Sequence, residues 1–199
     1  IIGLAPKTII IDVGTNVDCK PIQLLSFAII GEVFANRFWN ISEPKIGILS
    51  VGTEIGKGNK QVKETSELLS SSGLNFVGNV EGSDLPTGSV DVVVCDGFVG
   101  NIVMKLTEGI GSEISKYLTE TLKESIDAET SRVLAREIFK VTNPAAAYGA
   151  GPLLGVNGIS FVGHGRSKQD EIAEAISTAK RAVEVDFINQ IQKRLSKTL

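Results

Sequence analysis

Two kinds of apolar pattern alternate along this chain of 199 residues. Short runs rich in Ile and Val predict strands; they cover 8–13, 45–51, 75–80, 91–95 and 158–162. Apolar residues spaced three or four positions apart predict amphipathic helices; these cover about 21–39, 60–70, 100 to beyond 118, 128–141 and 168–194. The chain is therefore predicted to alternate strands with helices.

This alternation is typical of α/β proteins, in which a parallel sheet lies between layers of helices. The run Val92-Val93-Val94 is apolar at every position, as expected for a strand that is covered on both faces. Pro21 suits the first turn of a helix, because its missing N–H group would have no partner there. We predict one three-layer α/β/α domain with a mostly parallel sheet over residues 1–199.

The loops that follow the predicted strands carry most of the candidate chemistry. In a parallel sheet these loops leave the same edge, which is where α/β proteins bind ligands. The polar residues that this arrangement brings to one rim are Asn16, Thr53, Lys57, Asn59, Asn79, Glu81, Asp96 and Asn101. The sequence thus predicts a site built from loops that are far apart in the chain.

Composition excludes several classes of function. The chain is 42% hydrophobic and 22% charged, as expected of a globular protein. Its net charge of −3 does not suit a nucleic-acid binder, which needs a basic face. No apolar run is long enough to span a bilayer, and no secretory signal is visible. Cys19 and Cys95 form no disulfide framework, so we expect a cytoplasmic protein.

The loop Gly52–Asn59 combines three glycines with Lys57 ahead of a helix. Glycines let backbone N–H groups approach an anion, the helix N-terminus adds partial positive charge, and a lysine adds a full charge. A nucleoside triphosphatase is excluded, because the GxxxxGK[ST] spacing is absent and Gly58 stands where Ser or Thr is needed. The pattern favours an anion site and a plain glycine-rich turn with a solvated lysine equally.

A second informative loop follows the Val run. Asp96 ends a buried strand, where a carboxylate needs a partner or an open rim. Asp96 or Asn101 can cap the next helix, and spacing alone favours this interpretation. Alternatively, Asn101 can act as a neutral amide donor to a developing oxyanion. Asn16 suits a cap equally well, and Asn79 and Glu81 are typical of a polar strand end.

Metal and covalent chemistry receive no support from the sequence. His164 is the only histidine, and a lone histidine is more often structural than a general base. A metal would need clustered His, Cys or carboxylate side chains, whereas the rim offers mostly amides. No GxSxG motif occurs. The pattern favours an enzyme that positions an anionic nucleophile beside an electrophile.

Five sequence blocks occur in a fixed order, and they span nearly the whole chain: Ile11–Pro21, Gly52–Asn59, Val77–Gly82, Val92–Asn101 and Gly163–Gly165. Together they resemble the signature blocks of the bacterial phosphate acyltransferases of phospholipid synthesis (the PlsX type). That family is longer at its N-terminus, so this chain, which begins without Met, resembles its C-terminal part and is expected to lack the first elements. The resemblance implies a Rossmann-like fold, similar to isopropylmalate dehydrogenase and phosphotransacetylase.

The resemblance also implies a reaction, in which a fatty acyl group passes from acyl carrier protein to inorganic phosphate and gives acyl phosphate. By block position it assigns catalysis to Lys57, which would hold phosphate, and to Asn101, which would donate to the former carbonyl oxygen. The expected phosphate- and substrate-binding residues are Asn16, Thr53, Gly56, Gly58, Asn59, Asn79, Glu81, Asp96, Gly97, Gly100 and His164. No cofactor and no metal are expected, and the expected partners are acyl carrier protein, phosphate and a second copy in a homodimer.

Residues 125–157 are expected to form a protruding helical and loop element. Apolar residues recur there near helical spacing with basic residues between them, which is typical of an amphipathic helix packed on the core or on a second subunit. In similar proteins this region lies near the dimer interface and is associated with peripheral membrane contact and the acyl chain. The candidates for membrane or acyl-chain contact are Val133, Leu134, Ile138 and Phe139.

Two other functions remain open on sequence grounds. A phosphate acetyl- or butyryltransferase would share the fold type but would take a short acyl group from a coenzyme A thioester. A non-catalytic ligand-binding module on a dehydrogenase-like fold is the second. The GxGxxG fingerprint is absent, so the sequence does not support nicotinamide binding.

Overall fold

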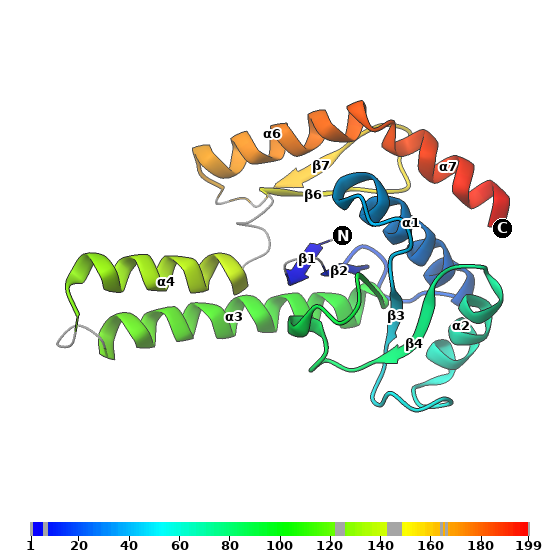
Figure 1. Ribbon diagram of the computed structural model, residues 1–199, viewed down its shortest axis with the longest axis horizontal. Helices are drawn as coiled ribbons and strands as arrows, with labels where there is room; N and C mark the ends of the chain where they lie inside the picture. The colour runs from blue at the N-terminus through cyan, green and yellow to red at the C-terminus, as the bar shows by residue number, and fades with distance from the viewer. Residues whose placement is uncertain are drawn as a thin grey trace.

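The computed structural model describes residues 2–5, 8–121, 126–142, 149–163, 165 and 167–198. Within these residues the main sheet has five strands in the order β1-β2-β5-β3-β4 (Figure 1). The strands are β1 (Ile2–Ala5), β2 (Thr8–Ile11), β3 (Ile46–Leu49), β4 (Phe76–Val80) and β5 (Val92–Val94). β1 is antiparallel to β2, and the other pairings are parallel. The predicted α/β/α fold with a mostly parallel sheet is confirmed.

One face of the sheet is covered by α1 (Pro21–Trp39) and α2 (Lys60–Ser71). A core cluster joins α1 to strand residues that all point to this face: Ile9, Ile11, Ile46, Ile48, Val92 and Val94. α1 has the predicted bounds, because Pro21 lies in its first turn and Asn40 ends it in the left-handed conformation. This face holds the larger part of the core.

The opposite face is covered more lightly. Its cluster consists of Ile10, Val80, Leu85, Val90, Val93 and Cys95. The short helix η1 (Leu85–Thr87) lies here and contacts β1. Since Val93 faces this side while its two neighbours in β5 face α1, the continuous Val run is buried on both faces, as predicted.

A long helical hairpin follows β5. It consists of α3 (Gly97–Thr121) and α4 (Ala128–Thr142), which pack side by side and extend away from the sheet (Figure 1). Ser115 on α3 donates its hydroxyl to the carbonyl oxygen of Ala135 on α4 at 3.2 Å. Only the start of α3 therefore lies at the edge of the sheet.

The C-terminal part differs from the prediction. The single helix expected over 168–194 is wrong, because α6 (Gln169–Glu184) and α7 (Phe187–Thr198) are separated at Asp186, which has a φ of 54°. This turn allows Phe187 to enter the core, where it is 1% exposed and lies edge-on to Phe34 and Phe38. The strand expected over 158–162 is also displaced: β7 (Phe161–Gly163) forms a separate antiparallel pair with β6 (Ala150–Pro152), which the sequence did not predict.

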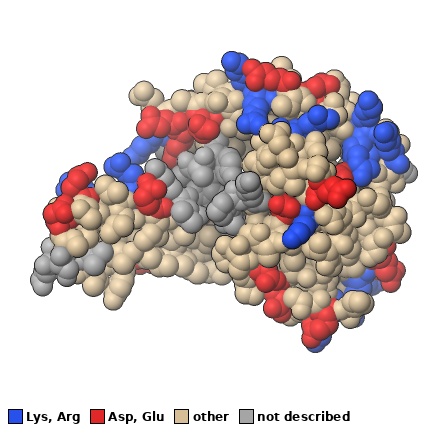
Figure 2. Space-filling view, in the orientation of Figure 1, with Lys and Arg blue, Asp and Glu red and all other residues tan. Residues whose placement is uncertain are grey.

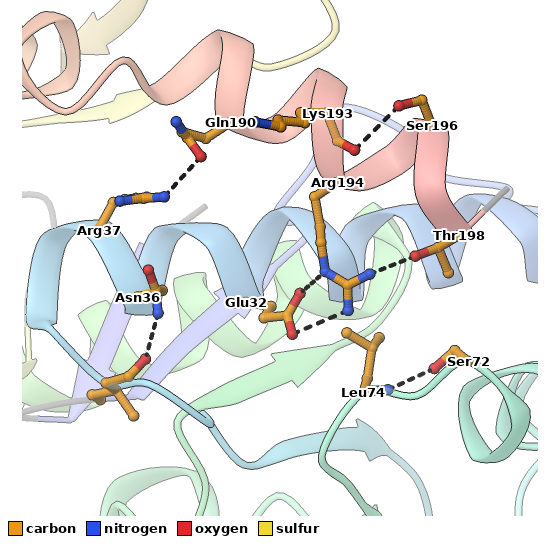
Figure 3. A network of polar contacts seen from close by, with 11 residues as sticks. Glu32, Asn36, Arg37, Ser72, Leu74, Gln190, Lys193, Arg194, Ser196 and Thr198 are labelled. Atoms are coloured by element: carbon orange, nitrogen blue, oxygen red, sulfur yellow. Dashed lines mark hydrogen bonds and ion pairs between the residues drawn. The ribbon is translucent and has the colours of Figure 1, made fainter.

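Polar contacts fix α7 to α1 (Figure 3). Arg194 donates from Nε to Glu32 at 2.7 Å and from Nη2 at 3.3 Å, and both side chains are partly buried. Arg37 on α1 donates to Gln190 on α7 at 2.7 Å. The C-terminal helix is thus held against the layer that covers the main core. Among the described helices, none has both the length and the apolar character needed to cross a membrane.

Candidate functional site

The sheet order determines which loops meet. The carboxyl ends of β2, β5, β3 and β4 lie next to one another in that order. β5 pairs in parallel with β2 on one side and with β3 on the other. The turn that leads to Asn101 therefore leaves the sheet between the loop after β2 and the loop that carries Lys57. The predicted convergence of the loops at one edge is confirmed by this topology.

Lys57 lies on an exposed loop between β3 and α2. Gly52 is buried beneath it, and a Cβ atom at position 52 would lie 3.2 Å from Lys57 Cγ. Gly58 has a φ of +100°, and a Cβ atom there would lie 2.6 Å from Val62 Cγ1, so the loop can enter α2 only with glycine at this position. The Lys57 side chain is exposed and has no hydrogen bond or ion pair with another described residue. Its ammonium group is open to an anion from solvent.

Two asparagines fix the backbone of this loop. Asn59 Oδ1 accepts an N–H group from the first turn of α2 at 2.9 Å and so caps that helix. Asn79, on β4, donates its side-chain amide to three carbonyl oxygens of the loop. These oxygens belong to Gly52, Glu54 and Lys57, at 3.2, 3.1 and 3.4 Å. The neighbouring strand thereby holds the segment that carries the lysine.

The turn after β5 presents Asn101 on the first part of α3. Asp96 Oδ1 accepts the N–H of Val99 at 2.8 Å, so the capping interpretation of Asp96 is confirmed. Asn101 is exposed, and its side chain has no hydrogen bond with another described residue. Its amide is available to an acceptor at the rim.

The start of α3 lies directly on the loop that follows β2. The N–H of Gly97 donates to the carbonyl oxygen of Asn16 at 2.7 Å, and a Cβ atom on Gly97 would lie 2.8 Å from that oxygen. A Cβ atom on Gly100 would collide with the carbonyl oxygen of Asp12. These glycines let the helix approach so closely that Gly14 lies beside the side chain of Asn101.

Asp12 organises this loop, and sequence reasoning missed it. It is 6% exposed, and its carboxylate accepts the N–H groups of Gly14 and Thr15 at 3.1 Å and that of Asn16 at 2.7 Å. It also accepts the side-chain amide of Asn16 at 2.9 Å. Burial acts to raise the pKa of Asp12, but these hydrogen bonds outweigh it and hold the pKa below its ordinary value of 3.8. The signal was available, because a carboxylate that ends a buried strand needs donors.

The predicted binding residues fall into two groups. Asn16, Asn59, Asn79 and Asp96 use their side chains for hydrogen bonds within the protein. Within the part of the chain that the structure describes, no such partner is found for the side chains of Thr53, Lys57, Glu81 and Asn101. Gly56 lies exposed at the tip of its loop with a φ of 86°. His164 lies outside the described residues, and its role stays a prediction.

The candidates for membrane or acyl-chain contact lie on α4, away from this edge (Figure 1). Val133, Leu134 and Phe139 are 46, 45 and 41% exposed, and Ile138 is half-buried. Their contact with a membrane or an acyl chain stays a prediction. Among the described residues, no group of three or more His, Cys, Asp or Glu side chains is placed to hold a metal ion.

Comparison with known proteins shows which family shares the stretch of chain that carries the rim residues. The family described as "Fatty acid synthesis protein" matches residues 3–190, which include every rim residue named above. A protein of Elusimicrobium minutum is 43% identical over 94% of this chain and 56% of its own length. One of Citrifermentans bemidjiense is 47% identical over 87% of the chain and 50% of its own length.

A protein of Aquifex aeolicus is 44% identical over 97% of this chain and 58% of its own length. All three relatives carry the name "Phosphate acyltransferase". The chain spans about half the length of the curated relatives that it matches.

Proposed function

The chain belongs to the fatty acid synthesis protein family, and we propose that it carries the catalytic rim of a phosphate acyltransferase. The enzyme would move a fatty acyl group from acyl carrier protein to inorganic phosphate and release acyl phosphate for phospholipid synthesis. The names of the relatives support transfer of an acyl group to phosphate. The identity of the acyl donor is our own extension of that name.

One observation carries this proposal. β3 and β5 are adjacent and parallel, so the loop with Lys57 and the helix start with Asn101 leave the same edge side by side. The exposed ammonium group of Lys57 and the exposed carboxamide of Asn101 have no hydrogen bond with another described residue, which supports a shared role for them at this edge. An anion and a carbonyl group are the two ligands that such a pair suits.

The reaction follows from these two groups. Lys57 binds the phosphate dianion and orients one of its oxygens toward the thioester carbonyl carbon. As the C–O bond forms, negative charge moves to the carbonyl oxygen, and the Asn101 amide donates to it. The C–S bond then breaks, its electron pair leaves on sulfur, and the carrier's thiolate takes up a proton. Positioning and electrostatic stabilisation supply the rate, without a covalent enzyme intermediate.

The decisive assay traps acyl phosphate with hydroxylamine, using the full-length protein, palmitoyl carrier protein and phosphate. We expect Lys57→Ala and Asn101→Ala each to lower turnover by at least about a hundredfold, because loss of one such donor typically costs about 2.7–4 kcal/mol of barrier. The matched controls are Lys60→Ala, whose side chain is 88% exposed near the same loop, and Asn157→Ala, which is exposed far from the rim in sequence. Both controls should keep the normal rate.

Parallel reactions with palmitoyl and acetyl coenzyme A distinguish the donors. Product from coenzyme A thioesters alone would replace the carrier-protein donor by coenzyme A. Absence of product from every donor would favour a non-catalytic binding module. Wild-type rates in both alanine variants would refute the assignment of the two residues, whichever donor is used.

We also propose that the enzyme is a homodimer. α3 exposes an apolar stripe along one side, formed by Ile102, Leu106, Ile110 and Ile114, each at least 43% exposed. An unpartnered stripe of this length on one helix suits a second helix of another subunit. Sedimentation equilibrium of Leu106→Glu tests this: a dimer that persists unchanged would place the interface elsewhere.

Membrane contact on the cytoplasmic side is the last part of the proposal. α4 presents Val133, Leu134 and Phe139 beside Arg132 and Arg136, a combination that suits an anionic lipid surface. Figure 2 shows acidic and basic side chains interspersed in this view, with further basic ones gathered near α7. Co-sedimentation with anionic vesicles should fall when Arg132 and Arg136 are changed to Glu, and equal binding by both forms would remove the idea.

A further inference from the structure

The loop after β2 is built around one carboxylate. Asp12 is almost fully buried just after β2, and its backbone N–H donates to the carbonyl oxygen of Cys95, the residue that follows β5, at 2.9 Å. Its side chain accepts hydrogen bonds from donors of three consecutive residues, Gly14 to Asn16, at 2.7 to 3.1 Å. These hydrogen bonds are charge-assisted, so the ionised carboxylate holds the loop around itself.

That shape is transmitted to α3. Asn16 accepts the N–H of Gly97 through its carbonyl oxygen, so the folded loop is bonded to the first residue of the helix. The loop also lies against Asn101, since an ideal Cβ atom on Gly14 would lie 3.6 Å from Asn101 Oδ1. The side chain of Asn101 has no hydrogen bond with another described residue, and this loop is the described segment that lies beside it.

The same hydrogen bonds exclude another role for the loop. A glycine-containing turn with three successive N–H groups resembles an anion-binding nest. Here those N–H groups point at Asp12 and are already used. We therefore expect phosphate to bind at the loop of Lys57, on the other side of β5.

From these contacts we propose that Asp12 is a positioning residue for Asn101. The proposal rests on the proposed function, in which Asn101 donates to the oxyanion. Asp12 touches neither phosphate nor the acyl group; it holds the loop that fixes the amide of Asn101. A displacement of about 1 Å in a catalytic group can cost a hundredfold in rate. Loss of Asp12 should thus lower kcat and leave the KM for phosphate unchanged.

The test uses Asp12→Asn in the full-length protein. This change keeps the size of the side chain but places an NH2 group against N–H donors, which breaks the arrangement. We expect kcat to fall about 10- to 100-fold. The control is Asp18→Asn, an identical change six positions along, at an exposed carboxylate without a hydrogen-bond partner among the described residues. It should keep the normal kcat and KM.

A double-mutant cycle separates positioning from a general structural effect. If Asp12 acts through Asn101, Asp12→Asn should add little to the loss already caused by Asn101→Ala, whereas it should add its full effect to Lys57→Ala. Should Asp12→Asn fail to fold, Asn16→Ala removes only the 2.9 Å side-chain bond and enters the same cycle with a smaller loss.

The outcomes are distinct. Full additivity with Asn101→Ala, or a raised KM for phosphate with unchanged kcat, overturns the positioning role while the proposed function stands. A normal rate in Asn101→Ala itself refutes the assignment of Asn101, and it overturns the positioning role with it, whereas absence of acyl phosphate from the wild type refutes the proposed function.

Discussion

Replacement of Gly100 by Ala tests whether α3 must lie this close to the loop after β2. Gly100 is helical, so Ala would favour the helix by about 1 kcal/mol if space allowed. Space does not allow it, because the new Cβ atom would collide with the carbonyl oxygen of Asp12 and would lie 3.0 Å from Cys95 Sγ. That carbonyl belongs to backbone that is paired with β5, so it cannot rotate away as a flexible side chain could.

The change in stability is the cost of the collision less the gain in helix propensity. Overpacking of a filled core costs about 1–3 kcal/mol, and a collision with paired backbone belongs at the upper end. After subtraction of the gain in helix propensity, Gly100→Ala should destabilise the protein by about 2 kcal/mol. Gly109 lies in the same helix, and apart from that helix's own backbone no atom of the described residues lies within 4 Å of its Cβ position, so Gly109→Ala should stabilise by about 1 kcal/mol.

Urea and thermal unfolding, followed by circular dichroism, measure both variants. For a protein of this size, each kcal/mol of stability gained or lost shifts Tm by about 2–4 °C. Gly100→Ala should therefore lower Tm by about 4–8 °C, and Gly109→Ala should raise it by about 2–4 °C. The reasoning would be wrong if Gly100→Ala unfolded at the same midpoint as the wild type or above it, because the helix would then have room to move.

Three further predictions concern stability. Hydrogen bonds hold the pKa of Asp12 below 3.8 in the folded protein, so its carboxylate contributes stability at neutral pH that is lost as pH falls through the folded pKa. In urea titrations below about pH 4, the wild type should therefore lose more stability than Asp12→Asn does. Phe187→Ala should cost about 3–5 kcal/mol in urea unfolding, because Phe187 is 1% exposed, whereas Ile55→Ala, at a fully exposed position, should change stability by less than about 0.5 kcal/mol. Asn59→Ala removes the cap of α2 and should cost about 1 kcal/mol by the same measurement, and no change would mean that the loop backbone caps the helix without it.

Elements with a strong local signal could be predicted from the sequence. α1 begins and ends where Pro21 and the apolar period indicate, because a proline in the first turn and a continuous apolar face leave few alternatives. The Val run of β5 also had one reasonable interpretation, a strand covered on both faces. Short strands carry too few residues for a period, so β1 and β6 were not recognised.

The break between α6 and α7 shows what local pattern cannot decide. Neither Gly nor Pro interrupts the apolar period around Asp186, so the sequence favours one helix. The chain turns there because burial of Phe187 against Phe34 and Phe38 outweighs the cost of a left-handed residue. That gain exists only when α1 is already in place beneath it.

For the site, the sequence by itself determined the chemistry that is present: an exposed lysine on a glycine-rich loop, and a carboxamide after a buried strand. Only the tertiary structure decided which polar side chains are open to a ligand and which form hydrogen bonds within the protein. Asn79 follows a predicted strand as Asn101 does, yet its amide is engaged by backbone carbonyl groups of the loop after β3, which lies beside β4. The physical reason is that a hydrogen bond depends on which strand lies beside which, and the order β2-β5-β3-β4 is set by packing of the whole sheet rather than by any one loop.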